Sequence, residues 1–520
     1  MSKNNIPNIP AEKFRFVASG QRLHDQKFET QKISYFRDAF NRFCKNKSSV
    51  TAAIIILCLV LYAIFVPMFC TTTYSAALTD TKYLNYTNLL PKNQLFVDMG
   101  LKFWDGGSDM TIGRGTYEAF KAMAQESGYD VFLEDYGTEN VGGKISYKVR
   151  MDSYTSIGYF YDTISPEEYK AIQEWQLETG IQVIFPATTD ATATDANIWY
   201  QADQKGIPQA DKNGDYVDIY RVDGVDGGYN SLRIPGDPGN DDPNAPDRYR
   251  YANVSGTADA PSYKVRLFKY TYFQFRYGFE PSFLFGTTAM GQDILTRLAN
   301  AARFSLLFAV CVASVNLFIG AIIGAIEGYY GGAVDMAIER IIDILSRVPF
   351  MVVATLFQLH LKGYLDQTIG YGAGAAAAMF LAFIMTGWIG MAGTTRMQFY
   401  RYKGQEYVLA SRVLGANDWR IMFRHIFPNS LGTIITSSVL VIPGVIFSES
   451  SLTYLNIVNL DTSTMTSVGT MLANARGSLQ QYPHIMLFPA LFISLLMISF
   501  NLFGNGLRDA FNPSLRGADE

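Results

Sequence analysis

Charged residues are scarce in this chain of 520 residues: they make up 17% of it, whereas about 25% is usual for soluble proteins. Four cysteines are too few for a disulfide-stabilised scaffold. A net charge of −4 argues against a strongly basic nucleic-acid binder, and 14% aromatic residues argue against disorder. The mean hydropathy of +0.06 indicates a hydrophobic part diluted by a polar part.

Six long apolar runs make up the hydrophobic part. The first, 51–66, is flanked by lysines and is long enough, with the next few residues, to cross a bilayer core of about 30 Å. It begins too far into the chain for a signal peptide, and no small-residue cleavage site follows it. The third run, 348–361, is short, and an amphipathic segment at 338–347 is expected to extend it. The five later runs are 304–326, 348–361, 372–392, 431–447 and 485–503.

Basic residues predict the topology of these six spans. Residues 1–49 hold ten Lys and Arg against four Asp and Glu, which favours a cytoplasmic N-terminus. Six crossings then return the C-terminus to the cytoplasm. The connection at 396–424 also falls inside, and its six Lys and Arg outnumber two Asp and Glu.

A long polar segment, 71–285, separates the first two spans and falls outside. It carries thirty Asp and Glu against nineteen Lys and Arg, and its length indicates a folded domain rather than a loop. Its patterns predict an α+β fold, with helices at 117–126 and 166–178 and strands at 181–185 and 263–277. The predicted divisions of the chain are 1–48 (cytoplasmic), 49–70 (first span), 71–285 (insert), 286–513 (five spans, with a cytoplasmic loop at 394–430) and 514–520 (cytoplasmic tail).

The insert offers little catalytic chemistry. Asp211, Asn213, Asp215 and Asp218 alternate as in a calcium loop, but Tyr216 and Val222 occupy the positions where an EF-hand needs Gly and Glu. A hairpin turn at residues 212–214 is therefore the favoured interpretation. The segment contains no histidine, so a histidine-based triad or zinc site is excluded within it. Cys70 is the only external cysteine, so no disulfide can form inside the insert.

The cytoplasmic connection carries the most informative pattern. Residues 406–414 form a predicted short helix, whose small side chains at Ala410 and Ser411 permit a partner to approach closely. Gly415 is expected to end that helix. Asp418 is expected to cap a second, basic helix that contains Arg420 and Arg424, and Pro428 to stop it.

This connection resembles the EAA loop of ABC importer permeases, in which a Glu is followed by Ala, Gly and Pro at these spacings. The resemblance implies that the loop docks on an ATPase subunit. Ser411 departs from the family pattern, which has a second Ala there. The residues that the resemblance assigns to coupling are Glu406, Ala410, Ser411, Gly415, Ala416, Arg420 and Pro428.

Further motifs are similar to the C-type subunits of the oligopeptide and dipeptide permease family. The resemblance covers the first span and about 281–513, but not the insert. Thr288, Gln292, Asn456 and Asn505 depart from the usual residues. The matching positions are Gly286, Thr287, Gly291, Asp293, Arg297 and Arg303 before the second span, Glu449 after the fifth, and Asn501, Gly506, Arg508 and Asp509 at the end of the sixth.

The family implies an all-α polytopic membrane protein of the type I ABC importer permease fold, here with an inserted α+β extracellular domain, in a bacterial plasma membrane. No ATP-binding Gly-x4-Gly-Lys-Ser/Thr motif occurs in the chain, so it is expected to be non-catalytic and to bind no cofactor itself. ATP and Mg²⁺ would bind two partner ATPase subunits. A B-type permease would complete the pore, and an extracellular, lipid-anchored peptide-binding protein would deliver oligopeptides or dipeptides.

Other readings stay open at this point. Nickel and glutathione importers share this subunit type, and a peptide sensor could keep the same fold without transporting. A membrane-tethered enzyme is the third class, with the insert as its catalytic domain. Glu449 is the only acidic group close to a span, and a helix-end carboxylate that meets water is its favoured interpretation. His360 is interpreted as a helix-end residue rather than a ligand.

Overall fold

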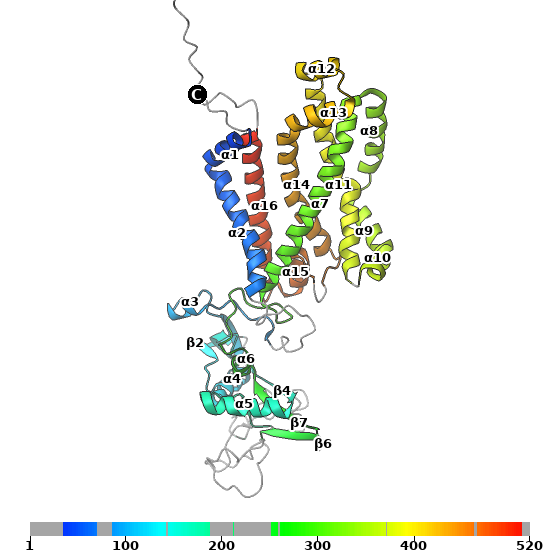
Figure 1. Ribbon diagram of the computed structural model, residues 1–520. Helices are drawn as coiled ribbons and strands as arrows, with labels where there is room; N and C mark the ends of the chain where they lie inside the picture. The colour runs from blue at the N-terminus through cyan, green and yellow to red at the C-terminus, as the bar shows by residue number, and fades with distance from the viewer. Residues whose placement is uncertain are drawn as a thin grey trace, which may run out of the picture.

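The fold is seen in a computed structural model that separates a helical bundle from a mixed unit at one end of it (Figure 1). The calcium-like loop at 211–218, apart from Lys212, and Cys70 lie outside the described residues. The described residues are 35–69, 86–141, 144–187, 212, 251–257, 260–370, 372–461 and 465–511.

Five helices of the bundle are long and apolar enough to cross a membrane, which agrees with five of the six predicted runs. Shorter helices precede or connect them: α1 (Tyr35–Lys45), α8 (Gly332–Ser346), α9 (Phe350–His360), α10 (Lys362–Ile369) and α15 (Val468–Ala475). The five long ones are α2 (Lys47–Phe69), α7 (Ile294–Tyr330), α11 (Ala373–Tyr402), α14 (Phe427–Tyr454), which continues from Asp418, and α16 (His484–Phe511).

The remaining predicted span is broken. Residues 338–347 are helical, as expected, but they belong to α8, which meets α9 at an angle of 75°. Pro349 lies at the break, and a proline disfavours helical geometry in the residue before it. The pair counts as one bent span or as a re-entrant segment, so the described residues contain five or six candidate spans. His360 is the last residue of α9, as predicted.

Close packing of α7 against α11 forms the centre of the bundle. Three glycines of α7 face α11, and a Cβ atom built on Gly324 would lie 2.2 Å from the carbonyl oxygen of Ala392. Only glycine permits this approach of two helix backbones. The surrounding core combines buried residues of α2, α7, α9, α11, α14, α15 and α16.

The described part of the insert contains two antiparallel sheets, which supports the predicted α+β fold. The first has the order β1–β3–β2, from Gly107–Gly113, Lys144–Asp152 and Phe132–Val141. In the second, β7 (Ala260–Phe268) pairs along one edge with β4 (Tyr159–Ile164) and along the other with β5 (Ile184–Phe185) and β6 (Ala252–Thr257). Within the same described ranges, the helices of the insert are α3 (Gln94–Asp98), α4 (Arg114–Ser127), α5 (Pro166–Thr179) and α6 (Lys269–Tyr277).

The two predicted helices of the insert are confirmed as α4 and α5, but the strand predictions are partly wrong. The predicted strand at 181–185 is reduced to its last two residues. The strand predicted at 263–277 ends at Phe268, and α6 follows directly. Every residue from Tyr270 to Gln274 is buried, so this segment has no polar face whose period could reveal the helix.

Two features hold the insert together and tie it to the bundle. Arg266 of β7 and Glu126 of α4 form a buried ion pair at 2.9 Å that connects the second sheet to the helix packed against the first. At the junction, Thr287 donates its backbone N–H to the Leu89 carbonyl (2.9 Å), and the Leu89 N–H donates to the Thr287 hydroxyl (2.8 Å). The two ends of the insert therefore pair with each other directly before α7.

Candidate functional site

The connection between α11 and α14 forms a small helical unit at the end of the bundle opposite the insert (Figure 1). Its first helix, α12, spans Glu406–Val413, which confirms the helix predicted there. Val408 is its one buried residue and packs into a cluster with Tyr329 of α7 and Phe399 of α11. Val408 therefore packs α12 against two long helices, while most of its other side chains are exposed.

Gly415 ends α12, as predicted. Its φ angle is +81°, in the left-handed region that side chains disfavour. The Gly415 N–H donates to the Arg412 carbonyl (3.0 Å) and the Ala416 N–H to the Ser411 carbonyl (3.1 Å). This pair of bonds is the Schellman arrangement that closes a helix C-terminus. A Cβ atom at Gly415 would meet open space, so its backbone conformation, rather than crowding, requires glycine.

The predicted cap of the next helix is wrong by one residue. Asn417, not Asp418, caps α13 (Asp418–Arg420), since the Asn417 side chain accepts from the Arg420 N–H at 2.9 Å. Both residue types suit this position, so the sequence does not distinguish them. Asp418 is left free to accept a hydrogen bond from outside the connection.

Pro428 does not stop the second helix, contrary to the prediction. A π-helical turn, η4 (Ile421–Ile426), follows α13 and leads directly into α14, in whose first turn Pro428 lies. The Phe427 N–H donates to the Met422 carbonyl, five residues back. The wider turn and the first-turn position accommodate the missing N–H of proline without a break.

The coupling residues predicted from the resemblance occupy this unit as a largely exposed group. Glu406, Ala410, Gly415, Arg420 and Pro428 are exposed, and Ser411 and Ala416 are half-buried. Apolar side chains that no sequence motif indicates lie beside them. Val413 and Leu414 are each 87% exposed, and Trp419 is 62% exposed. An exposed apolar patch at the tip of a fixed helix is typical of a protein-binding surface.

Tyr329 connects this unit to the bundle. Its hydroxyl lies near the end of α7, donates to the Asp418 carboxylate at 2.6 Å and accepts from the Arg412 guanidinium at 3.3 Å. On the other side, the Asn429 amide donates to the Tyr407 hydroxyl at 3.3 Å, and partial burial raises the pKa of Tyr407. Both helices of the connection are thereby bonded to long helices.

A second polar group at the same end joins α8 to α11. The Arg396 guanidinium donates to both oxygens of Asp335 (2.6 and 2.8 Å) and also to Glu339 (2.5 Å). The Tyr400 hydroxyl donates to the same Asp335 carboxylate at 2.7 Å. The first helix of the bent pair, α8, is therefore fixed to α11, which leads into α12.

The predicted motif residues before α7 build a tight turn at the opposite end. Gly286 and Gly291 both have a φ angle of +75°, and Asp293 caps α7 by accepting from the Thr296 N–H at 2.9 Å. Thr288 stands where the family usually has Asp. Its hydroxyl accepts from the backbone N–H groups of Met290 and Gln292, each at 3.2 Å, as a carboxylate could.

Arg297 and Asp461 form an ion pair at 2.6 Å beside this turn. Arg297 is only 5% exposed, and the Asn474 amide also donates to Asp461, at 2.8 Å. The pair borders a small cavity of about 180 Å³ between the starts of α7 and α16 and the short helix α15. Arg303, six residues further along α7, is exposed and donates to Asn300 at 3.4 Å.

The interpretation of Glu449 as a water-exposed carboxylate is wrong. Its exposed fraction is 0%, and its carboxylate accepts from the hydroxyls of Ser305 (3.1 Å) and Ser450 (3.3 Å). The short helix α15 packs against α14 and closes the site: a Cβ atom on Gly469 would lie 2.4 Å from the Cα of Ser450. Glu449 therefore lies inside the contact of α7, α14 and α15.

One residue of the motif at the end of α16, Gly506, allows close packing of two helices. A Cβ atom on Gly506 would lie 1.8 Å from the Ser49 hydroxyl, so only glycine lets the start of α2 approach α16 here. Asn501, Arg508 and Asp509 are exposed on the same helix. The predicted residues thus form groups at both ends of the bundle, not one catalytic centre. Among the described residues, no three His, Cys, Asp or Glu side chains lie close enough to hold a metal ion.

Comparison with known proteins agrees with this geometry. The family model for the binding-protein-dependent transport system inner membrane component matches residues 316–517, and that for the N-terminal TM domain of oligopeptide transport permease C matches 34–91. The oligopeptide transport system permease protein OppC of Bacillus subtilis is 40% identical over 232 residues, which is 45% of this chain and 72% of that protein.

The chain belongs to the C subunits of the oligopeptide and dipeptide ABC importer permeases. The dipeptide transport system permease protein DppC of Lactococcus lactis is 37% identical and covers 44% of this chain and 64% of its own length. OppC of Escherichia coli K12 is 34% identical and covers 46% of this chain and 74% of its own length.

Other departures of this permease from the family pattern also fit the local geometry. Asn456 stands where the family usually has Gly, and its φ angle is +58°. Asn tolerates this left-handed conformation better than most residues. Tyr329 and Asn417 position the connection around α12, and no sequence motif indicates either of them. Tyr329 lies within the residues that the first family model matches, but its hydrogen-bond partner, Asp418, is 89 residues away in the chain.

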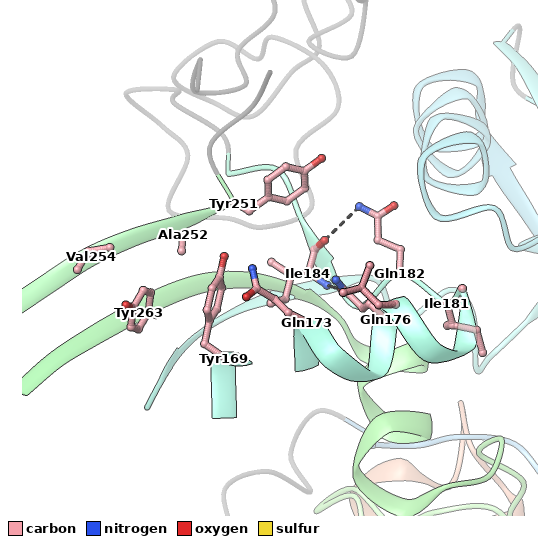
Figure 2. Close-up of a pocket in the computed structure, with 12 residues that line it drawn as sticks. Tyr169, Gln173, Gln176, Ile181, Gln182, Ile184, Tyr251, Ala252, Val254 and Tyr263 are labelled. Carbon is pink, nitrogen blue, oxygen red and sulfur yellow. Dashed lines mark hydrogen bonds between the residues drawn. The ribbon is translucent and has the colours of Figure 1, made fainter. Parts of the chain in front are cut away.

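Neither family model covers residues 92–315, which include most of the insert. One side of the insert is hollowed into a cavity of about 810 Å³ between α5 and strands β5–β7 (Figure 2). Its lining is uncharged and combines tyrosine and glutamine side chains with aliphatic ones. The residues are Tyr169, Gln173, Gln176, Leu177, Gly180, Ile181, Gln182, Ile184, Tyr251, Ala252, Val254 and Tyr263.

Proposed function

We propose that this chain is one of the two membrane subunits of an ATP-driven importer that carries oligopeptides or dipeptides into the cell. The relatives named as oligopeptide and dipeptide permeases support the cargo class. The observation that carries the mechanism is the exposed helix α12, fixed to α7 through Tyr329, because it offers a rigid element for an ATPase to move.

The proposed complex contains a B-type permease subunit as the second half of the pore and two ATPase subunits that bind ATP and Mg²⁺. This chain would bind no cofactor. Glu406, Ala410, Ser411, Gly415 and the exposed Leu414 would contact a groove on one ATPase. An extracellular, lipid-anchored protein would deliver peptide on the side of the insert.

The proposed topology counts α8 and α9 as one bent span, which gives six crossings with both termini in the cytoplasm. The basic residues around α12 and before α2 support this orientation, since Lys and Arg concentrate on the cytoplasmic side. The insert would then lie outside the bacterial plasma membrane.

Motion would pass from the ATPases to the peptide path through the contacts described above. When two ATPases close on ATP, a shift of α12 would move α7 through Tyr329 and α14 through Asn429. At the other end, α7 bears Arg297 and Ser305, whose partners lie on the α14–α15 segment. A displacement of α7 would change these contacts and open the outer side, as in other two-state switches.

Purification of the chain from its native host with its partners tests the subunit assignment. Co-purification of two ATPase subunits and a second permease, together with ATP-dependent accumulation of labelled peptide in proteoliposomes, is the expected result. Accumulation of nickel or glutathione that peptides do not inhibit would contradict the cargo. ATPase binding without any transport would favour a sensor instead.

A further inference from the structure

A loop at the base of the insert exposes an unusual concentration of apolar side chains. We refer to residues 93–104, which include α3, as the aromatic loop. Monomeric proteins rarely expose such contiguous apolar patches unless the patch contacts a partner or a membrane. The exposed fractions are 66% for Leu95, 70% for Met99, 45% for Leu101 and 61% for Phe103.

Three aromatic rings organise this loop. The ring centroids of Phe103 and Trp104 lie 4.1 Å apart, and Phe96 lies 6.0 Å from each of them. Trp104 adopts a φ angle of +59°, which is rare and costly for a bulky residue. In this conformation the indole N–H donates to the Leu284 carbonyl. The strained backbone therefore holds the indole between the loop and the chain that leads into α7.

The aromatic loop lies where the apolar surface of the bundle ends. The ring centroid of Trp104 lies 6.2 Å from that of Phe488 in α16. The Phe285 ring stacks on the Phe488 ring at a centroid distance of 4.1 Å. In Figure 1, α3 lies near the ends of α2 and α16 that face the insert. That end of α2 is itself apolar and exposed, with Met68 at 62% and Phe69 at 79%. The patch thus continues the surface that faces lipid.

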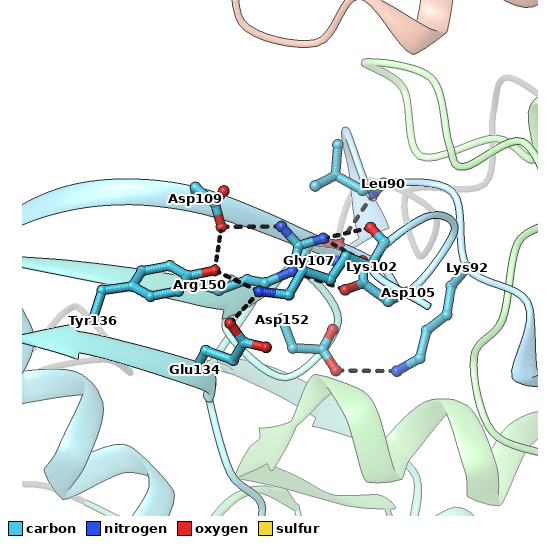
Figure 3. Close-up of polar contacts among 11 residues, drawn as sticks. Leu90, Lys92, Lys102, Asp105, Gly107, Asp109, Glu134, Tyr136, Arg150 and Asp152 are labelled. Carbon is cyan, nitrogen blue, oxygen red and sulfur yellow. Dashed lines mark hydrogen bonds and ion pairs between the residues drawn. The ribbon is translucent and has the colours of Figure 1, made fainter. Parts of the chain in front are cut away.

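Ion pairs and hydrogen bonds fix the base of the loop (Figure 3). Arg150 pairs with Asp105 at 2.7 Å and donates to the Lys102 carbonyl at 2.8 Å, and the Asn93 N–H donates to the Trp104 carbonyl at 2.8 Å. The Lys102 ammonium pairs with the Glu134 carboxylate at 2.6 Å, and this contact lowers the pKa of Glu134. Asp98 is the only other charged residue of the loop.

We propose that the aromatic loop inserts into the interfacial layer of the lipid leaflet on the side of the insert. Aromatic side chains with a polar atom prefer this layer, and apolar neighbours reach the acyl chains below it. Lipid fits this patch better than a protein partner because the patch is continuous with helices that already face lipid. The insertion would orient the whole insert against the membrane.

Spin labelling of the full chain in phosphatidylcholine–phosphatidylglycerol nanodiscs tests this proposal. The four native cysteines would be replaced by Ser, and a nitroxide would be attached to Phe103→Cys. The matched control is Leu177→Cys, because Leu177 is an apolar residue of the insert that is 86% exposed on α5, away from the bundle. Each variant would first have to elute as a monodisperse species.

The readout is collision of the nitroxide with oxygen, which concentrates in lipid, and with a water-soluble nickel chelate. We expect the oxygen-to-nickel ratio at position 103 to exceed that at position 177 severalfold. Equal, water-like ratios at both positions would overturn the proposal. Low accessibility to both reagents at position 103, seen only when a second permease subunit is present, would assign the loop to a protein interface and also overturn it.

Discussion

The Tyr329 hydroxyl donates a 2.6 Å hydrogen bond to Asp418, and this bond joins the long helix α7 to the connection that contains α12. Arg412, in the last turn of α12, donates to the same hydroxyl at 3.3 Å. One side chain of a membrane helix therefore contacts both sides of the Gly415 turn. A force applied to α12 reaches α7 through this contact as well as through the covalent chain.

Replacement of Tyr329 by Phe should uncouple ATP hydrolysis from transport. The variant keeps the ring in the cluster around Val408 but loses the hydroxyl, and one such bond contributes about 1 kcal/mol. We expect peptide moved per ATP hydrolysed to fall by about fivefold, with unchanged ATPase binding. Tyr330→Phe, at a neighbouring position that is 52% exposed, is the control and should transport normally. Equal coupling in both variants would remove Tyr329 from the pathway.

Removal of one partner from the buried Arg266–Glu126 pair should destabilise the insert. Arg266→Met leaves the Glu126 carboxylate buried without its cation, and such losses cost about 3–5 kcal/mol. Pulse proteolysis of the full-length protein in detergent should show faster cleavage within the insert. The exposed Lys170–Glu174 pair provides the control, since Glu174→Gln should change the free energy of unfolding by less than about 0.5 kcal/mol. Similar effects of both changes would contradict the role of the buried pair.

Acid should weaken the first sheet of the insert. The hydrogen bond from Arg150 lowers the pKa of Asp109, and the bond from Tyr117 lowers that of Asp135. The folded insert thus binds fewer protons than the unfolded chain near these pKa values, so its stability is full above the ordinary aspartate pKa and falls below about pH 4. Hydrogen exchange in β1–β3 should be constant from pH 7 to 5, after correction for the intrinsic rate, and should show added opening near pH 3. Arg150→Met should reduce this dependence.

A bulkier residue at Gly506 should separate α2 from α16. A Cβ atom there would overlap the Ser49 hydroxyl, so even Gly506→Ala requires the two helices to move apart. Gly390→Ala in α11 is the matched control, because a Cβ atom at that position meets open space. We expect a lower midpoint of thermal unfolding in detergent for Gly506→Ala and an equal or higher one for Gly390→Ala. A normal midpoint for Gly506→Ala would contradict the tight packing.

Local patterns predicted the elements whose signals are local. The apolar run of α2, the helix α12 and its glycine stop each depend on neighbouring residues alone, and the structure contains all three. Asn417 and Asp418 are adjacent and chemically similar, so the sequence could not choose the cap. The burial of Glu449 depends on α15, about twenty residues later, and the burial of α6 depends on both sheets. Contacts between segments that are far apart in the chain produce no periodic pattern in the local sequence.

ATP-driven peptide uptake by proteoliposomes that contain the complete complex tests the central claim most directly. The comparison is between the native chain and Gly415→Asp, which places a side chain and a charge at the +81° turn beside α12. Gly477→Asp, at an exposed glycine on the side of the insert, is the control. The account predicts uptake by the native and Gly477→Asp complexes and none by Gly415→Asp, although all three insert in the membrane. Normal uptake by Gly415→Asp would contradict it.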